Sequence, residues 1–352
     1  MAHKEQLIAA KKNIAWDFKP QFQRVKPLFE NALVVGNLET VFAGEEHGFA
    51  EFPMFNTPDE FADALSDLGL SVVTLANNHI LDRKPSGAAR TIRVLERSGI
   101  KWTGLGHDGT GSNEALVLEH GGLRWAFVNY TYGSNAPVPS FDDTRGVHLN
   151  VISDEAIRQG LLNARAARPD IIVACFHWGN EYQFVPTKRQ RAVAALSICE
   201  GADIVIGTHP HVLQPLEIAS SEHGYGLVAY SLGNFVSNQR KLPQERSLIL
   251  AVDVQKTGGK AARISRVSVA PTRISVTRPL GGSLIEVVYA GESARFNHEG
   301  LPTSELKKVQ QAGAAVLEFV GAATSPDKEG FYTLWSADFP ELLPKGNRKT
   351  PK

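Results

Sequence analysis

Metal-type side chains are concentrated in a few short motifs of this 352-residue chain, and each motif directly follows a run of apolar residues. Four of the eleven histidines lie in these motifs, together with amide and carboxylate side chains. The motifs are Asn37-Leu38-Glu39, Asn77-Asn78-His79, His177-Trp178, His209-Pro210-His211 and Gly233-Asn234. A mixed shell of imidazole nitrogens, an amide oxygen and a carboxylate suits Mn, Fe or Zn better than Ca or Mg. The motifs therefore predict a transition-metal site.

The spacing of His209 and His211 indicates which chemistry such a site performs. On an extended chain, residues i and i+2 project to the same side, so the two imidazoles would serve one metal or two neighbouring metals. Two metals about 3.5 to 4 Å apart hold a bridging hydroxide and clamp the attacking and leaving oxygens of a phosphoryl displacement. A further histidine outside the ligand set would protonate the leaving group. The pattern predicts metal-assisted hydrolysis.

The apolar runs that precede the motifs predict the fold class. They are unbroken rather than alternating, which is typical of strands buried on both faces of a helix-covered sheet. Glycines 121 and 122 interrupt residues 115–130 and predict a hairpin, and hence mixed sheets. The predicted strands are residues 33–36, 72–76, 125–130, 171–176, 204–207, 227–230 and 248–254, and the predicted helices are residues 57–68, 86–98, 153–168 and 187–200. We expect an α/β protein whose motifs meet beyond the carboxyl ends of its strands.

The chain after residue 254 predicts the end of one unit and a smaller second one. Residues 264–269 and 274–276 have the pattern of two short strands, which would close a domain of residues 1–278. Residues 301–320 place apolar side chains at helical spacing and predict a docking helix, although Gly313 lies inside it. Residues 331–335 predict an aromatic anchor. We expect residues 279–352 to form a C-terminal extension.

Composition and missing motifs exclude several function classes. The 37 basic and 37 acidic residues give zero formal charge, so no overall field attracts a nucleic acid. No apolar run approaches the roughly 18 residues of a membrane span, and the first residues lack the apolar stretch of a signal peptide. Neither a GxSxG elbow nor a P-loop motif occurs. The GxGxxG match at residues 104–109 precedes a predicted hairpin rather than a helix, and Cys175 and Cys199 fit core positions.

In order and wording, the motifs resemble those of the CapA family of capsule-synthesis proteins, a branch of the calcineurin-like metallophosphoesterases. The matching segments are GNLET at 36–40, LANNHILD at 75–82, HWGNEY at 177–182, GTHPHV at 207–212 and SLGNFV at 231–236. The resemblance implies a four-layer α/β/β/α sandwich with mixed sheets and a dinuclear metal site. It also implies association with poly-γ-glutamate capsule or another cell-envelope polymer.

Carried over by position, the resemblance assigns metal-binding roles to Glu39, Asn78, His177, His209 and His211. Asn78, His177 and His209 would bind the second metal and His211 the first, while Glu39 stands roughly where phosphoesterases have a bridging aspartate. The catalytic role falls to His79, in the place of the superfamily's acid or phosphate-contacting histidine. Residues expected to support these ligands or to contact substrate are His3, Asn37, Asp82, Trp178, Glu181 and Asn234.

One part of the family pattern is missing from this sequence. Family members open with an apolar strand that ends in Gly-Asp, whose aspartate binds the first metal, and Met1-Ala2-His3 resembles the end of that phrase. We therefore expect the strand to be encoded upstream of Met1, with its loss as the alternative. The location is cytoplasmic for the chain as written, but a leader or anchor upstream of Met1 would change it.

The leading hypothesis is a metal-dependent hydrolase with two divalent transition metals, Mn, Fe or Zn, and a phosphoester as the first substrate class to test. One alternative is hydrolysis or transfer at a γ-glutamyl amide, where the same metals would polarise a carbonyl. Another is a non-catalytic polymer-binding or assembly component. The expected partners are a small or polymeric anionic substrate and capsule or envelope assembly proteins, and no nucleic acid.

Overall fold

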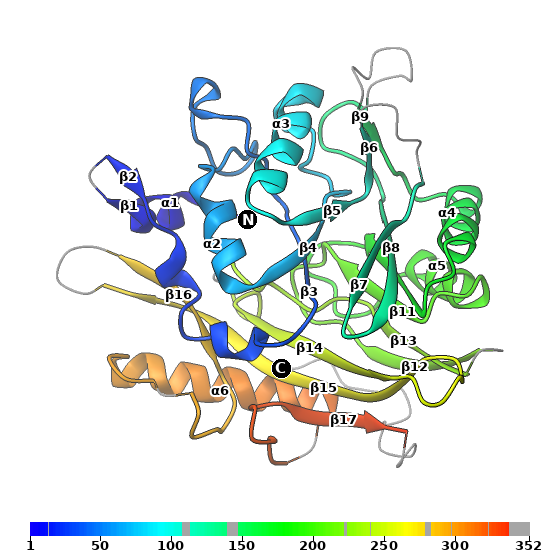
Figure 1. The fold of residues 1–352 in the computed structure, drawn as a ribbon. Coiled ribbons are helices and arrows are strands. Elements are labelled where there is room, and N and C mark those ends of the chain that lie inside the picture. Colours follow the sequence, from blue (N-terminus) through cyan, green and yellow to red (C-terminus); the bar gives the residue numbers. More distant parts are fainter. Residues whose placement is uncertain are drawn as a thin grey trace.

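The computed structural model describes residues 1–12, 14–107, 113–138, 147–221, 224–239, 241–278, 283–296, 298–322 and 324–337. These residues form an α/β protein with several sheets, as predicted (Figure 1). The α-helices that lie in them are α1 (Lys4–Ala10), α2 (Glu60–Leu68), α3 (Lys84–Arg97), α4 (Asp154–Ala166), α5 (Lys188–Cys199) and α6 (Thr303–Val320). Single 3-10 turns occur at Lys19–Gln21, Lys26–Phe29 and Glu45–His47.

The largest sheet has six strands in the order β12-β13-β11-β10-β8-β7. Its strands are β7 (Leu116–His120), β8 (Leu123–Thr131), β10 (Ile171–His177), β11 (Ile204–Thr208), β12 (Leu216–Ser221) and β13 (Gly224–Ala229). The four inner strands are parallel, and the edge strands β7 and β12 pair antiparallel with their neighbours. The mixed sheet and the β7–β8 hairpin across Gly121 and Gly122 are confirmed.

Both faces of this sheet are covered, which explains its unbroken apolar strands. On one face, Ile157 and Leu161 of α4 and Val193 of α5 pack in one core cluster with Val128 and Phe176 of the sheet. The opposite face contributes alternate residues of the same strands to a second, larger core, which α2, α3 and a four-stranded sheet also line. Figure 1 shows α4 and α5 together beside β8 and β11.

A second sheet has three parallel strands in the order β3-β4-β5, and predicted site residues follow two of these strands. Its strands are β3 (Val34–Asn37), β4 (Leu70–Thr74) and β5 (Lys101–Thr103). Two short pairs accompany it, namely β1 (Lys11–Lys12) with β2 (Ala15–Trp16), and β6 (Leu105–His107) with β9 (Val147–Leu149). Residues 108 and 109, the end of the GxGxxG match, lie outside the described residues.

The remaining sheet consists of β14 (Arg246–Gln255), β15 (Arg263–Thr277), β16 (Leu284–Tyr289) and β17 (Tyr332–Ser336). The prediction of two short strands at 264–269 and 274–276 is wrong, because β15 continues through Pro271. The Pro271 carbonyl accepts the Ala290 N–H, and in a strand the nitrogen of a residue points to the same side as its carbonyl. On that side Pro271 falls between the pairings of β15 with β17 and with β16, so its missing N–H leaves no ladder bond unmade.

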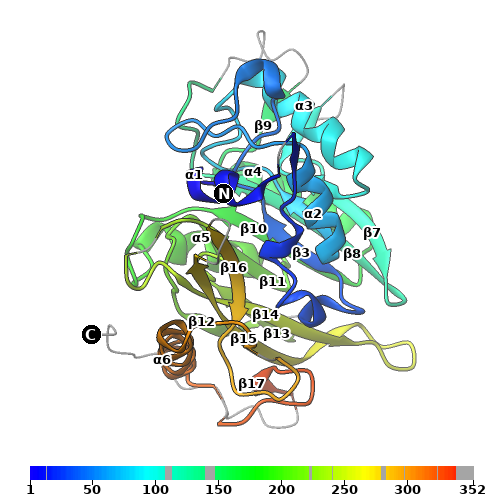
Figure 2. The ribbon, with the colours of Figure 1, turned by 90° about the vertical axis from the view of Figure 1, so that its left-hand side faces the viewer.

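Helix α6 lies against this sheet, below β14 and β15 in Figure 1 and end-on in Figure 2. The predicted docking helix at residues 301–320 is thereby confirmed as a helix. Gly313 faces the Ala290 carbonyl so closely that a Cβ would collide with that oxygen. The aromatic residues 331–335 form most of strand β17, whose Trp335 is buried. The domain boundary at residue 278 stays a prediction.

Two local expectations are corrected. The helix predicted at residues 57–68 begins only at Glu60, and the Thr57 hydroxyl pairs with the Thr40 hydroxyl at 2.7 Å. Cys175 is buried in β10, but Cys199 is the exposed last residue of α5 rather than a core residue. None of the helices in the described parts of the chain combines the length and apolar character of a membrane span.

Candidate metal centre

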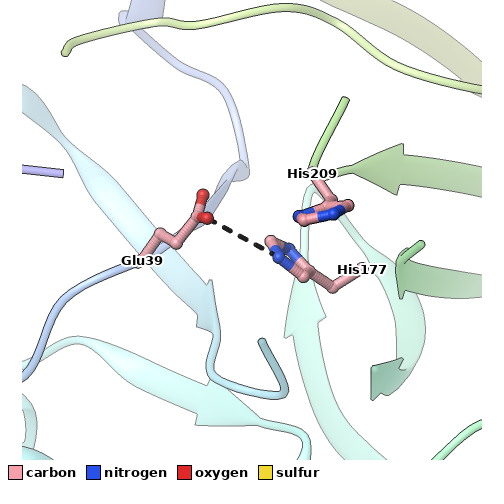
Figure 3. A group of neighbouring side chains, drawn as sticks. All are labelled: Glu39, His177 and His209. Carbon is pink, nitrogen blue, oxygen red and sulfur yellow. Dashed lines mark ion pairs between the residues drawn. The ribbon is translucent and has the colours of Figure 1, made fainter. Parts of the chain in front are cut away.

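Polar side chains from the six-stranded and the three-stranded sheet meet at the carboxyl ends of parallel strands. Glu39 follows β3, Asn78 follows β4, His177 ends β10, and His209 comes directly after β11. Ligand atoms of Glu39, His177 and His209 all lie within 4.8 Å of one another (Figure 3). The strand ends therefore assemble a buried cluster of one carboxylate and two imidazoles, as the order of motifs predicted.

Glu39 reaches into the cluster from β3 with one carboxylate oxygen unpaired. Asn37 donates from Nδ2 to Oε2 at 3.3 Å, whereas the buried Oε1 has no hydrogen-bond partner. Oε1 lies 3.6 Å from Nε2 of His177 and 3.8 Å from Nε2 of His211. Burial raises the pKa of Glu39 to about 7, although the chain's terminal ammonium and His79 pull in the opposite direction. An anionic Glu39 therefore lacks compensating charge.

His177 is held from both ring nitrogens. Nδ1 lies 2.9 Å from the Thr208 hydroxyl of the neighbouring strand, and Nε2 lies 2.8 Å from Oδ1 of Asn78. Burial, together with the neighbouring histidines, lowers the pKa of His177 well below its ordinary value. The imidazole is therefore neutral at physiological pH, which is the form that binds metals.

The turn that carries His209 and His211 is not an extended chain. Both residues have positive φ, 95° for His209 and 58° for His211, so the assumption of alternating extended geometry was wrong. The left-handed turn still brings the two rings to a centroid distance of 5.9 Å. Nδ1 of His209 is buried without a partner, and burial lowers the pKa values of His209 and His211 to about 4 and about 3.

Asn234 selects the nitrogen that His211 presents. Its Nδ2 donates to backbone and side-chain oxygens of His211, Gln239 and Gln244, which leaves Oδ1 as the acceptor 3.0 Å from Nδ1 of His211. Nδ1 of His211 therefore carries the proton, and Nε2 is the free nitrogen that faces Glu39. A hydrogen bond of this kind fixes both the tautomer and the ring orientation of a ligating histidine.

His79 lies beside the cluster and pairs with a buried carboxylate. Nδ1 donates to Oδ2 of Asp82 at 2.8 Å, and the same oxygen accepts the Phe55 N–H at 2.7 Å. The Phe55 ring contacts His79 edge-on at a centroid distance of 4.7 Å. On the opposite side of the ring, Nε2 lies 3.5 Å from Nδ2 of Asn135. The ring is thus oriented with Nε2 away from the carboxylate.

A comparison with protein families identifies the family to which the chain belongs. The family model of the bacterial capsule synthesis protein PGA_cap matches residues 1–239. The chain belongs to this family. All of Glu39, Asn78, His79, His177, His209, His211 and Asn234 lie within the matched part of the PGA_cap protein.

Individual relatives carry matching names. The capsule biosynthesis protein CapA of Bacillus anthracis is 29% identical over 62% of this chain and 54% of its own length. The PGA biosynthesis protein CapA of Bacillus subtilis is 29% identical over 67% of this chain and 62% of its own length. This PGA_cap chain thus spans little more than half of these relatives. Among solved structures, the sulfate thiohydrolase SoxB of Thermus thermophilus matches with a TM-score of 0.37 and 13% identity, over 76% of this chain and 40% of that one.

Two further predicted residues lie at different distances from the cluster. His3 packs edge-on against Phe55, the ring that also contacts His79, and its Nε2 is buried without a partner. Trp178 instead faces the core between the sheet and α5, where its indole N–H donates to the Tyr230 carbonyl at 3.0 Å. The structure therefore brings His3 towards the site and places Trp178 away from it.

Two residues after β8 also belong to the site, although the sequence reasoning missed them. Tyr132, 46% exposed, lies over the rings of His177 and His209 at centroid distances of 6.2 and 4.8 Å. Asn135 accepts from Nδ2 of Asn78 at 3.3 Å and also contacts His79. Both could have been found from the sequence, because they follow the predicted strand at residues 125–130 just as the other site residues follow their strands.

The residues present fit a divalent cation. Two buried polar atoms, Oε1 of Glu39 and Nδ1 of His209, have no partner in a cluster whose histidines are neutral. Buried unpaired polar atoms are costly, so an unpaired carboxylate oxygen among imidazole nitrogens is typical of a ligand position. Nitrogen and carboxylate ligands together suit a transition metal.

Proposed function

We propose that this PGA_cap protein is a metal-dependent hydrolase, with phosphoesters as the first substrate class. The observation that carries the proposal is the buried Glu39–His177–His209 cluster with unpaired ligand atoms, next to the His79–Asp82 pair. The four-layer α/β/β/α sandwich of the metallophosphoesterases is part of the proposal, supported by sheets with covered faces.

Five residues would hold two divalent transition metals: Glu39, Asn78, His177, His209 and His211. When bound, such metals activate water and stabilise negative charge on the reacting oxygens. The protein's part is to present neutral imidazoles and a carboxylate in fixed orientations. Asn37 supports Glu39, and Asn234 directs Nε2 of His211 into the site.

His79 is the residue proposed to move a proton. The Asp82 carboxylate accepts from Nδ1, so it fixes the ring and stabilises the protonated imidazole. Nε2 then carries the proton that is given to the leaving oxygen. Asn135, which contacts both Asn78 and His79, keeps the amide ligand and the proton donor at a constant separation.

The names of the relatives point to a biological role. Because the CapA proteins of two Bacillus species are named for capsule and PGA biosynthesis, we infer that this chain acts in the synthesis of poly-γ-glutamate or a similar anionic envelope polymer. Such a polymer is joined by amide bonds, so γ-glutamyl amide hydrolysis or transfer is the second candidate reaction. Both reactions need a polarised, negatively charged transition state.

The test compares two substrates on protein stripped with a chelator and reloaded with Mn²⁺, Zn²⁺ or Fe²⁺. Hydrolysis of bis(p-nitrophenyl) phosphate supports the phosphoesterase, and hydrolysis of γ-glutamyl-p-nitroanilide alone supports the second candidate. His209→Ala should abolish both tight metal binding and turnover. His120→Ala is the matched control, because His120 lies in the β7–β8 hairpin at the opposite end of β8. Metal content below one per chain, with His209→Ala equal to the parent, would favour a non-catalytic assembly component.

A further inference from the structure

Glu181 brings a second carboxylate to the site, from its exposed side. Ligand atoms of Glu181, His209 and His211 lie within 4.8 Å of one another, and Oε1 of Glu181 is 4.0 Å from Nε2 of His211. We propose that Glu181 joins His211 in holding the second of the two cations, which binds more weakly than the cation in the buried cluster. This inference rests on the proposed metal-dependent function and assigns Glu181 as a metal ligand.

The backbone of Glu181 is fixed although its side chain is 45% exposed. The turn after β10 is tied to the histidine turn by two hydrogen bonds, from the Trp178 N–H to the Thr208 carbonyl and from the Tyr182 N–H to the Pro210 carbonyl at 2.7 Å. Tyr182 adopts φ of 62°, which a residue other than glycine rarely does. The turn therefore fixes the main chain from which the Glu181 carboxylate reaches to within 4.0 Å of His211.

Glu39 lies between the two positions. Its unpaired Oε1 is almost equally distant from Nε2 of His177 and from Nε2 of His211, at 3.6 and 3.8 Å. One carboxylate shared by two dications leaves excess positive charge. Glu181 supplies additional negative charge next to His211. The Glu39 carboxylate alone does not balance the charge of two cations.

Exposure explains why the two positions should differ in affinity. The side chains of Glu39 and His177 are 7% and 0% exposed, whereas that of Glu181 is 45% exposed. Attraction between a cation and a carboxylate weakens as water raises the effective dielectric. The cation at Glu181 also binds against the charge of the one already held in the buried cluster. We therefore expect the Glu181 position to fill last and to exchange first.

The experiment titrates the metal-free full chain with Mn²⁺ in a calorimeter. The parent should show two binding events of different affinity. Glu181→Gln, which keeps the size and removes the charge, should weaken the second event by at least about 10-fold and leave the first unchanged. Glu181→Asp should weaken the second event less than Glu181→Gln does. Glu119→Gln is the matched control, because Glu119 is an exposed carboxylate in the distant β7–β8 hairpin.

The outcomes separate this inference from the proposed function. A single binding event in the parent, or a second event unchanged in Glu181→Gln, overturns the assignment of Glu181 even where phosphodiester hydrolysis is observed. Two events, of which Glu181→Gln loses the weaker, support it even where neither test substrate is hydrolysed. Circular dichroism of each variant shows that the fold is kept, as an exposed side chain predicts.

Discussion

At the scale of single residues, the site combines unpaired buried polar atoms with left-handed backbone conformations, two features that also occur elsewhere in the described residues. Buried atoms of Glu39 and His209 lack partners, and both His209 and His211 have left-handed backbones. Unpaired buried polar atoms and left-handed residues other than glycine each cost on the order of 1 to 3 kcal/mol. A bound cation would satisfy the unpaired atoms, so these costs are consistent with function rather than with folding alone.

Asp82→Asn should separate proton transfer from metal binding. The asparagine keeps an oxygen for the Phe55 N–H but removes the charge that stabilises a protonated His79. We expect kcat to fall by about 10²- to 10⁴-fold while KM changes little, because the proposed metal ligands are untouched. Steady-state kinetics and metal analysis of the same preparation measure both. A loss of metal in proportion to the loss of kcat would instead show that Asp82 supports the metal site.

At the scale of elements, the sequence predicted where the inner strands lie, but not where individual helices and strands begin or continue. Unbroken apolar runs identify the inner strands, because these strands are buried on both faces. The polar residues that directly follow the runs identify the site, because they lie at the ends of those strands. The helix predicted to start at residue 57 starts at Glu60 instead, and a distant partner, Thr40, binds the Thr57 hydroxyl. Likewise, no local pattern shows that Pro271 faces a gap between two neighbouring strands. Tertiary contacts decide such details, and they are not visible in a local pattern.

Gly313→Ala tests whether α6 depends on close approach to the sheet. Alanine favours a helix over glycine by about 1 kcal/mol, but here its Cβ would collide with the Ala290 carbonyl. We expect the collision to prevail and the free energy of unfolding to fall by about 1 to 3 kcal/mol. Urea denaturation measures the change. The control is Ala314→Ser, which changes an exposed neighbour and should shift the free energy of unfolding by less than about 0.5 kcal/mol. A Gly313→Ala variant that is more stable than the parent would contradict the packing argument.

At the scale of the whole molecule, the site joins two sheets whose strands do not pair with each other. Glu39 and Asn78 come from the three-stranded sheet, and His177, His209 and His211 come from the six-stranded sheet. The sequence predicted that these residues gather, but it did not show how the two sheets approach each other or that Tyr132 lies over the rings of His177 and His209. Zero net charge coexists with this local concentration of ligands, so composition alone does not reveal the site.

The pH dependence of cation binding should be set by Glu39. Because burial raises the pKa of Glu39 to about 7, the metal-free folded protein keeps a proton that the unfolded chain releases above its ordinary pKa of 4.5. Taken alone, Glu39 makes the metal-free protein less stable as the pH rises from about 4.5 to 7, and a bound cation reverses this contribution by displacing the proton. Burial lowers the pKa values of His209 and His211 to about 4 and about 3, so these histidines release few protons to a cation near neutrality. For the same reason they act against Glu39 in folding stability, because the unfolded chain binds protons at these imidazoles below about pH 6.5.

We therefore expect the first Mn²⁺ bound per chain to release more protons at pH 6 than at pH 8, because a carboxyl group with a pKa of about 7 is mostly protonated only at the lower pH. Apparent affinity should rise over the same range. Calorimetric titration in two buffers of different ionisation enthalpy measures the released protons, and Glu119→Gln should behave as the parent does. Proton release that is absent at pH 6, or larger at pH 8, would show that a group other than Glu39 controls the site.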